Sequence, residues 1–241
     1  MKKGFTLAEV LITLGIIGVV AAMTIPGLIQ NSKNKELQTK LKKAYSDWNQ
    51  VAMKFMEEHD EPVGTYLKQN GAAATLNELT KQFTTKTQSG TAWSDSYKRY
   101  TLVGNIINAG QPCDDTIKFS ETQGQIYNID IIHDAKFNGP RLCIDLNGKD
   151  KPNKFGIDIF SFIFTTDGHV IPEGQHHPDN NYNPGEWSVG GTVKASSENC
   201  AGSAVNNSLG CTYFAINDKS PLGKGSYWND FIKKKQYNKQ Q

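Results

Sequence analysis

The sequence lacks the motifs of several common enzyme classes. It contains no Gly-x-Ser-x-Gly nucleophile setting, no GxxxxGKS phosphate-binding loop and no GxGxxG dinucleotide motif. Serine, histidine and aspartate are all present, but no segment combines them in a recognisable catalytic setting. The sequence therefore predicts a protein that is not an enzyme.

Charge of one sign is not in excess either. The 26 Lys and Arg residues nearly balance the 24 Asp and Glu residues, which gives a formal net charge of +2. This balance argues against nucleic-acid binding through a broadly basic surface. The basic run Lys233–Lys235 is interpreted as a solvated chain end, so nucleic acid is not an expected partner.

What the sequence does have is one long apolar run near its N-terminus. From residue 5 to residue 25 every side chain is apolar or small except Thr6, Glu9, Thr13 and Thr24. As a helix these 21 residues would span roughly 30 Å, the thickness of the hydrocarbon core of a bilayer. Lys2 and Lys3 precede the run and predict an N-terminus on the cytoplasmic side. We expect a single-pass membrane protein whose remaining chain is extracytoplasmic.

Glu9 is the informative exception within the apolar run. A carboxylate at this depth costs on the order of 3 kcal/mol unless it has a partner, so it indicates a function. The run contains no Lys or Arg that could pair with it. The nearest candidate cation is a free α-amino group, created by cleavage and supplied by a neighbouring chain.

The order Gly4, Phe5, Thr6-Leu7-Ala8-Glu9, followed by an apolar run that ends at Pro26, resembles the N-terminal segment of type IV pilins and type II secretion pseudopilins. The resemblance implies that a prepilin peptidase cuts after Gly4 and methylates Phe5. It also implies that Glu9 acts in subunit assembly and that Pro26 kinks the helix. The chain departs from the family at Ala8, where a bulky aliphatic residue is usual.

Two alternatives to this resemblance are an ordinary secretory signal and a generic anchor helix. A secretory signal would be cleaved after the apolar run, where Ala21-Ala22-Met23 offers only a weak site. Neither alternative explains Gly4 and Glu9 together. Removal of residues 1–4 also takes away two lysines and leaves a formal net charge of zero.

The predicted domains are a leader peptide (1–4), an N-terminal helix (5–59, transmembrane over 5–25) and an extracytoplasmic globular domain (60–241). Beyond the membrane, apolar residues recur at three- and four-residue spacings from Leu37 to Met56, which predicts an amphipathic helix that Glu61-Pro62 ends. Pro26-Gly27 predicts a kink or a locally melted turn between the two halves.

The rest of the chain predicts an antiparallel sheet after a helix, hence an α+β fold. A short helix is expected over 72–83, with Thr75 and Glu78 as a capping box, and 97–107 could be helix or strand. Strands are expected over 116–119, 125–132, 141–146 and 158–166, and a tight Asp167-Gly168 turn leads to another over 169–171. Residues 173–210 are expected to form a long irregular region.

The four cysteines lie far beyond the membrane segment. An even number in an extracytoplasmic domain predicts two disulfides, and the sequence allows three pairings. We favour Cys200–Cys211, which closes a short loop, and by default Cys113–Cys143. Free thiols are the alternative, and a zinc site is disfavoured because no pair has CxxC or CxxxC spacing.

The segment 144–158 is a candidate calcium loop. Asp145, Asn147 and Asp150 place oxygens at near-alternate positions around a glycine turn, and Asp158 returns after the loop. Calcium binds six to eight oxygen ligands, and the loop loosely resembles the calcium loop of major pseudopilins. No other cofactor is expected.

A polar turn between two strands is the alternative to the calcium loop. The bidentate glutamate of an EF-hand is missing, and three lysines lie in the loop: Lys149, Lys151 and Lys154. A second acidic and histidine-rich group, His169, His176, His177 and Asp179, is interpreted as solvated loop residues. The many aromatic residues outside the helix are expected mainly in the core.

The sequence thus favours a pilin-like structural subunit of a type IV pilus or a type II secretion pseudopilus in the bacterial inner membrane. Its expected partners are prepilin peptidase, other pilin or pseudopilin subunits, an inner-membrane assembly platform and membrane lipid. The large domain favours a minor or specialised subunit. The alternative is a membrane-anchored sugar- or peptide-binding module that never polymerises.

Overall fold

The computed structural model describes residues 4, 6–83, 86–88, 97–107, 113, 117–121, 124–130, 140–165, 167–175, 200, 202 and 205–237. The chain divides into two compact units, Met1–Glu36 and Leu37–Gln241. A long apolar N-terminal helix precedes an antiparallel sheet, which confirms the predicted α+β class. The second half of the long helix belongs to the core of the second unit, and the predicted domain bounds stay a prediction.

Helix α1 (Leu7–His59) is one continuous helix of 53 residues that contains Pro26. The predicted melted turn at Pro26-Gly27 is therefore wrong. A proline removes one backbone hydrogen bond, and here the neighbouring turns keep the helical path on both sides. A kink at Pro26 stays a prediction.

The second half of α1 carries the predicted apolar stripe. The buried side chains recur every three or four residues: Leu41, Ala44, Trp48, Val51, Ala52 and Phe55. They belong to one hydrophobic cluster with residues of the sheet, so this stripe is the face of the helix that packs in the domain. The helix ends at His59, and Asp60 turns the chain in the left-handed region (φ 58°).

Helix α2 (Val63–Thr80) follows directly and is broken at Gly71, whose φ of 79° and ψ of 171° are not helical. The part after Gly71 corresponds to the predicted 72–83 helix, whereas the part before it was not predicted. The predicted capping box is wrong, because Thr75 lies inside the helix and its hydroxyl donates to the Gly71 carbonyl at 2.8 Å.

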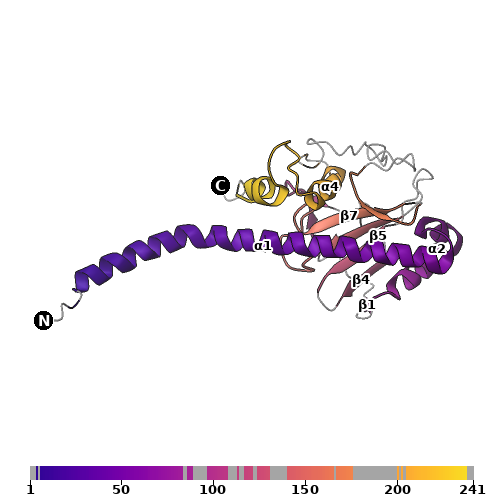
Figure 1. Ribbon diagram of the computed structural model, residues 1–241, viewed down its shortest axis with the longest axis horizontal. Helices are drawn as coiled ribbons and strands as arrows, with labels where there is room; N and C mark the ends of the chain where they lie inside the picture. Colours follow the sequence, from indigo (N-terminus) through magenta and orange to yellow (C-terminus); the bar gives the residue numbers. More distant parts are fainter. Residues whose placement is uncertain are drawn as a thin grey trace. The chain divides into compact units, whose positions relative to one another are not determined.

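Within the described residues the main sheet has six antiparallel strands in the order β1-β4-β5-β6-β7-β8, of which Figure 1 labels β1, β4, β5 and β7. Their bounds are β1 Lys86–Gln88, β4 Ile117–Glu121, β5 Ile126–Asp130, β6 Arg141–Asp145, β7 Ile159–Phe164 and β8 Val170–Pro172. The predicted strands and the tight turn before β8 are thereby confirmed. The segment 97–107, for which the sequence allowed either helix or strand, forms a small antiparallel pair of strands, β2 (Arg99–Tyr100) and β3 (Ile106–Ile107).

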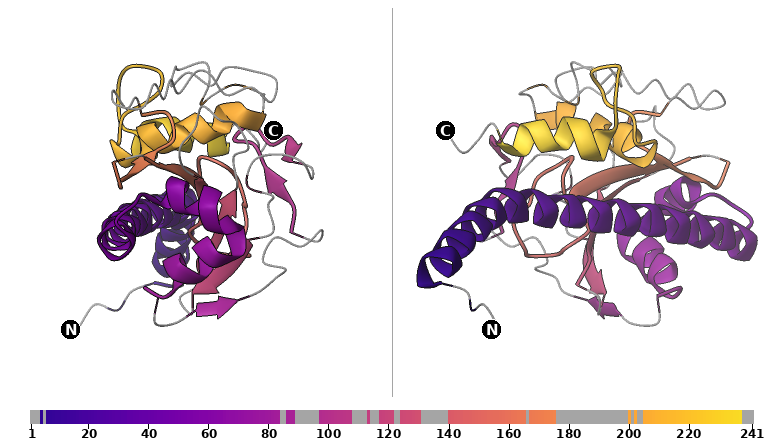
Figure 2. Two further views of the ribbon diagram at one scale, coloured as in Figure 1. Left: turned by 90° about the vertical axis from the view of Figure 1, so that its right-hand side faces the viewer. Right: turned by 60° about the vertical axis from the view of Figure 1, so that its left-hand side comes forward.

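The central strands β6 and β7 are buried on both faces, because the sheet is covered on both sides. Leu142 and Phe162 are cross-strand partners that belong to the cluster containing α1. Their neighbours Cys143 and Ser161 face the other way, where Cys143 joins a second cluster with Leu209. In Figure 2 the orange strands lie between the part of α1 after residue 36 (purple) and the C-terminal helices (yellow).

The described residues between 205 and 237 contain four short helices that the sequence analysis did not predict. The elements are η2 (Val205–Gly210), α4 (Cys211–Ile216), η3 (Tyr227–Phe231) and α5 (Ile232–Tyr237). Tyr227, Trp228 and Phe231 are buried and join the main core, as predicted for aromatic residues outside the long helix. In the expected irregular region 173–210, residues 205–210 form η2 instead, and residues 176–199, 201, 203 and 204 lie outside the described residues.

Candidate functional site

The N-terminal end of α1 carries a reciprocal hydrogen-bonded cap. The backbone N–H and the hydroxyl of Thr6 both donate to Glu9 Oε2 at 2.8 Å, and the Glu9 N–H donates to the Thr6 hydroxyl at 3.3 Å. This is a capping box, with Thr6 at the N-cap and Glu9 at the third helical position. Gly4 lies just before it, and Phe5 lies outside the described residues. Sequence reasoning singled out Glu9 but missed the role of Thr6.

The apolar side chains that follow the cap are exposed. Leu7 is 80% exposed, Ile17 is 62% exposed and Met23 is 77% exposed. Within the described residues, α1 is the one helix long and apolar enough to cross a membrane, and the apolar window lies near the N-terminus. Contiguous apolar surface of this extent is not stable in water, so this segment requires lipid or apolar partners.

The loop after β6 brings two of the predicted calcium ligands together. Asp145 and Asp158 are both fully buried. Asp145 accepts hydrogen bonds from the Tyr97 hydroxyl and from the Asn147 N–H, the latter at 3.1 Å. Asp158 accepts from the N–H groups of Asn153 at 2.8 Å and Lys154 at 2.6 Å. The two carboxyl groups thus hold both ends of the loop.

Two amide oxygens in the same loop are buried and lack a hydrogen-bond partner. They are Asn147 Oδ1 and Asn153 Oδ1, and Asn153 is only 8% exposed. A buried carbonyl oxygen without a donor is costly, so each is a candidate ligand for a cation. Asp150, in contrast, is exposed at the loop tip, and its backbone carbonyl accepts from Asn147 Nδ2 at 3.1 Å. The structure therefore places Asn153 beside the candidate site, a residue that the sequence analysis did not select.

The buried carboxyl groups of Asp145 and Asp158 favour either a bound cation or a retained proton. Burial raises the pKa of Asp145 well above its usual value, and the neighbouring Asp158 charge raises it further. Burial also raises the pKa of Asp158 to about 6, against the opposing effect of its backbone hydrogen bonds. Burial likewise raises the pKa of Tyr97 well above its usual value, so its hydroxyl stays a hydrogen-bond donor.

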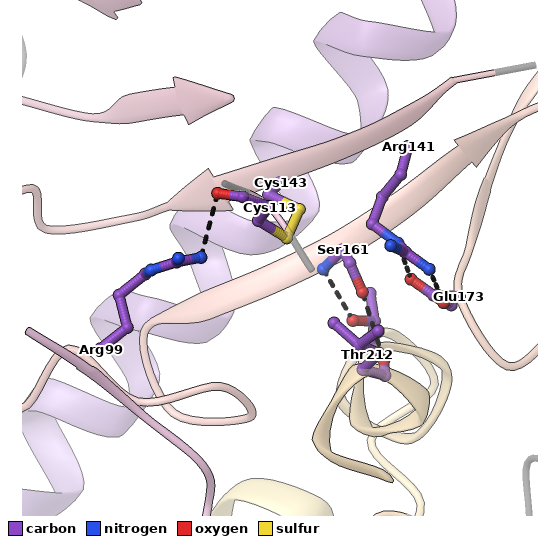
Figure 3. The surroundings of a disulfide bond; sticks show 8 residues. Arg99, Cys113, Arg141, Cys143, Ser161, Glu173 and Thr212 are labelled. Carbon is purple, nitrogen blue, oxygen red and sulfur yellow. Dashed lines mark hydrogen bonds and ion pairs between the residues drawn. A yellow bond between two sulfur atoms is a disulfide. The ribbon is translucent and has the colours of Figure 1, made fainter. Parts of the chain in front are cut away.

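Both favoured disulfides are present, and no cysteine is free. Cys113–Cys143 links the central strand β6 to the chain before β4, and Arg99 donates to the Cys113 carbonyl at 3.0 Å (Figure 3). Cys200–Cys211 joins the chain before η2 to the start of α4. All four cysteines are fully buried, so the disulfides belong to the core rather than to a reactive surface.

The other candidate residues do not form a site in the described part of the chain. His169 is exposed in the turn before β8, and His176, His177 and Asp179 lie outside the described residues. Within the described residues no group of three or more His, Cys, Asp or Glu side chains converges as a metal site. A cation in the 145–158 loop would therefore need amide, hydroxyl or backbone oxygens beside the two carboxylates.

Residues 1–25 match the family model described as the prokaryotic N-terminal methylation motif. The start of the chain is therefore a type IV pilin-like prepilin cleavage and methylation segment. This motif implies processing by prepilin peptidase and pilin-type assembly in general, and it fits a membrane-anchored single-pass protein. No curated protein and no solved structure matches the chain.

Proposed function

We propose that the protein is a pilin-like structural subunit, not an enzyme, of a type IV pilus or a type II secretion pseudopilus. The observation that carries the proposal is an exposed apolar helix that begins with a prepilin-type segment and is joined to a disulfide-bonded domain. In the membrane this helix is solvated by lipid. In a filament the same side chains pack against those of neighbouring subunits.

The sequence of events follows from the N-terminus. Lys2 and Lys3 hold the leader on the cytoplasmic side, and the apolar segment keeps the subunit in the inner membrane as a reservoir. Prepilin peptidase cuts after Gly4 and methylates the new N-terminal Phe5. An inner-membrane assembly platform then transfers the subunit into the filament, where the domain faces outward.

Glu9 sets the register of assembly. In the isolated subunit its carboxylate is held by Thr6, so it has hydrogen-bond donors but no counter-charge from that residue. In the filament the carboxylate pairs with the Phe5 amine of an adjacent subunit. A subunit docked out of register would leave both charges unpaired in a medium of low dielectric constant, which costs several kcal/mol by general estimates.

Mass spectrometry of the N-terminus tests the processing step. We expect a methylated Phe5 in cells that contain prepilin peptidase and an intact Met1 in cells without it. An uncut protein in both strains, or a cut after residue 25, would exclude the filament proposal. It would leave the alternative, an anchored or secreted module that binds sugar or peptide and does not polymerise.

A pair of substitutions separates the charge of Glu9 from its capping role. Glu9→Gln keeps an oxygen that accepts from Thr6 but removes the charge, whereas Glu9→Ala removes both. We expect both variants to be processed and stable in the membrane and both to lose filaments. Filaments of normal abundance with Glu9→Gln would contradict the charge-pairing step, and filaments of normal abundance with both variants would mean that Glu9 is not needed for assembly. An unmodified protein that is processed but forms no filaments would favour the non-polymerising module.

We also propose calcium as a ligand of the 145–158 loop. The two buried carboxylates, the partner-less oxygens of Asn147 and Asn153, and the Tyr97 hydroxyl supply the hard oxygen chemistry that calcium prefers. A divalent cation would offset the charge of Asp145 and Asp158 at neutral pH. The Phe155 N–H donates to the Tyr100 carbonyl at 3.0 Å, so this loop is hydrogen bonded to the 97–107 segment. Bound calcium would therefore stabilise the loop against which that segment packs.

The calcium proposal has a matched control in the same loop. At saturating calcium, about 100 times the dissociation constant, we expect a gain near 2.7 kcal/mol, hence a rise of several degrees in melting temperature. Asp145→Asn or Asp158→Asn should abolish this rise, whereas Asp150→Asn should keep it because Asp150 is exposed. No calcium-dependent rise in the unmodified protein, measured after EDTA treatment, would exclude the site.

A further inference from the structure

The side of α1 that faces away from the sheet carries an exposed stripe of side chains. Lys42, Ser46, Met53 and Glu57 are spaced by four, seven and four residues, so they lie within about 60° of one another around the helix axis. All four are exposed, whereas Trp48 on the opposite side of the helix is fully buried. Figure 1 shows this half of α1 in front of the strands, so the side away from the sheet faces the reader.

The two ends of this half of α1 carry opposite charge. Residues 37–43 contain three lysines and no acidic residue, and residues 57–61 contain four acidic residues and no lysine or arginine. One acidic and one basic residue lie between these segments and cancel. Beside the acidic end, α2 contributes Glu78 and Lys81, which pair with each other. The acidic end therefore stays negative.

Neither helix stability nor pairing within the chain explains this arrangement. A cation is favoured at the carbonyl end of a helix, yet Glu57 and Glu58 lie in the last turn of α1. Lys43 and Lys54 pair with carboxylates one turn further along the helix, at 3.0 and 3.6 Å. In the described part of the chain, however, the side chains of Lys42 and Glu57 have no ion pair or hydrogen bond. Each end of the exposed stripe thus carries one unpaired charge.

Two copies of this helix match only when they are displaced along its axis. Lys42 and Glu57 are 15 positions apart, which is about 22 Å at 1.5 Å per residue. The anchors of all copies enter the bilayer in the same direction, so copies at equal depth are parallel and place like charges side by side. The anchor spans only about 30 Å of hydrocarbon, so the required displacement cannot occur while both copies remain in the bilayer.

We infer that this stripe is a contact surface for a second copy of the chain, in which Lys42 of one subunit pairs with Glu57 of a neighbour displaced by about 22 Å along the helix axis. Met53, which is 57% exposed, lies between the two charges and supplies apolar surface to the same contact. Because exposed ion pairs are individually weak, the contact selects the displacement of the neighbour rather than holding the assembly together. The inference rests on the proposed filament function, since it requires subunits that leave the bilayer.

This contact would be open-ended. Each subunit uses its Lys42 end for one neighbour and its Glu57 end for another, which makes the contact heterologous. Because the copies are displaced along the axis, the contact cannot close into a ring and repeats as a filament. The proposed pairing of Glu9 with Phe5 spans only four positions, about 6 Å, so it is made with a different neighbour.

Charge exchange between the two positions tests the inference, in the full-length protein and in cells that contain prepilin peptidase. Lys42→Glu and Glu57→Lys should each reduce the amount of filament sheared from the cells by roughly fivefold, because like charges then meet. The combination Lys42→Glu/Glu57→Lys should restore the amount to within about twofold of the unmodified protein.

The matched control is Lys42→Glu/Glu58→Lys. It has the same net charge as the compensating combination but places the lysine about 100° further around the helix, so its filament yield should stay as low as that of Lys42→Glu. All three substituted side chains are exposed, so the melting temperature of the solubilised subunits should not change.

Cysteine cross-linking reports on the displacement itself. The four native cysteines are bonded, so Lys42→Cys and Glu57→Cys each add one free thiol. When the two variants carry different tags and are expressed together, we expect an oxidised dimer that carries both tags in filaments. This dimer should be absent from cells that lack prepilin peptidase, where the two thiols lie at different heights. Filaments without the mixed dimer would contradict the inference.

The outcomes separate this inference from the filament proposal. Filaments of normal abundance with either single charge reversal, or a compensating combination that stays as low as the single variants, would overturn the inference alone. Equal rescue by the Glu58 control would also overturn it, because net charge rather than register would then decide assembly. A processed, unmodified protein that forms no filaments would exclude both.

Discussion

The two halves of α1 are parts of one helix with opposite surroundings. In the first half, apolar residues lie all around the helix and are exposed, as at Ile17, which is 62% exposed. In the second half they form one stripe, and Trp48 and Leu41 are fully buried. The first pattern suits a surrounding of lipid or other helices, and the second suits one packed face with water on the other. A helix of uniform secondary structure thus combines an anchor with a core element.

Trp48 offers the largest effect with which to test this contrast. Its ring lies 5.0 to 6.0 Å from the rings of four aromatic residues: Phe83, Phe119, Tyr127 and Phe164. Trp48→Ala would leave a cavity among these rings and is expected to cost about 3–5 kcal/mol, which lowers the melting temperature of the domain by roughly 10 °C. The matched change Ile17→Ala should leave the melting temperature of the domain unaltered. Equal losses in the two variants would contradict the division of the helix.

The buried carboxyl pair predicts a pH dependence of stability. The folded pKa of Asp158 is raised from 3.8 to about 6, so the folded state binds the proton more tightly than the unfolded state does. Stability therefore falls as pH rises from about 4 to above 6, by about 3 kcal/mol in all for Asp158 and by roughly half of that above pH 5, and Asp145 extends the fall to higher pH. In EDTA, the melting temperature should decrease more between pH 5 and pH 8 in the unmodified protein than in Asp158→Asn.

The control for this prediction is Asp150→Asn. Asp150 lies in the same loop but is exposed, so its substitution should keep the full pH dependence. If saturating calcium replaces the protons, it should also reduce the fall between pH 5 and pH 8 in the unmodified protein. A pH dependence that is identical in Asp158→Asn and the unmodified protein would exclude the buried pair as its source.

Substitution of Asn49 should have a smaller effect on stability, because Asn49 contacts the edge strand β8. The Thr165 N–H donates to the His169 carbonyl, so His169 faces β7. The N–H of the next residue, Val170, therefore points away from β7. This N–H donates to Asn49 Oδ1 at 3.0 Å. Pro172 has no N–H at the equivalent position two residues later. The outward-facing donors of this edge are thus either satisfied or missing, which discourages pairing with another chain.

Asn49→Ala should therefore cost about 1–2 kcal/mol and increase self-association of the folded protein, because the Val170 N–H loses its acceptor. Gln50→Ala, at the neighbouring exposed position of α1, is the control and should change neither property. Thermal unfolding and light scattering measure the two effects. If Asn49→Ala and Gln50→Ala behave alike, the edge N–H does not need the side chain of α1.

Local periodicity predicted much of the fold, whereas it could not predict elements that are stabilised by contacts between residues far apart in the sequence. The stripe on α1 and the strands β6 and β7 follow from side-chain spacing, and the two disulfides follow from an even cysteine count and a preference for the short loop. The C-terminal helices were missed because each is only five or six residues long and depends on packing, as η3 does through the buried side chains of Tyr227, Trp228 and Phe231. In the candidate site, Asp145 and Asp158 were selected from spacing alone, whereas Asn153 is placed beside them by the loop conformation.

The Thr-x-x-Glu pattern shows the same limit within two short segments. The pattern occurs at Thr6–Glu9 and at Thr75–Glu78, and only the first forms a capping box. At Thr75 the chain is already helical after the break at Gly71, so the hydroxyl donates backward to a carbonyl instead of accepting from an N–H. The pattern is thus informative only where the chain is not yet helical.

Removal of the Thr6 hydroxyl is the smallest expected effect and the most local one. Thr6→Val deletes two of the three bonds between Thr6 and Glu9 but keeps the backbone N–H, so it should cost about 1 kcal/mol and fray only the first turn of α1. Faster amide hydrogen exchange at Glu9 and Val10 in detergent micelles, with an unchanged melting temperature of the domain, is the expected result. Thr13→Val is the control, because the Thr13 hydroxyl donates to carbonyls inside the helix and caps no N–H. If Thr13→Val accelerated exchange at Glu9 as much as Thr6→Val, the helix start would depend on general polarity in the first turns rather than on the capping box. In the expected case, the Glu9 carboxylate is already oriented by its own chain before the proposed assembly step.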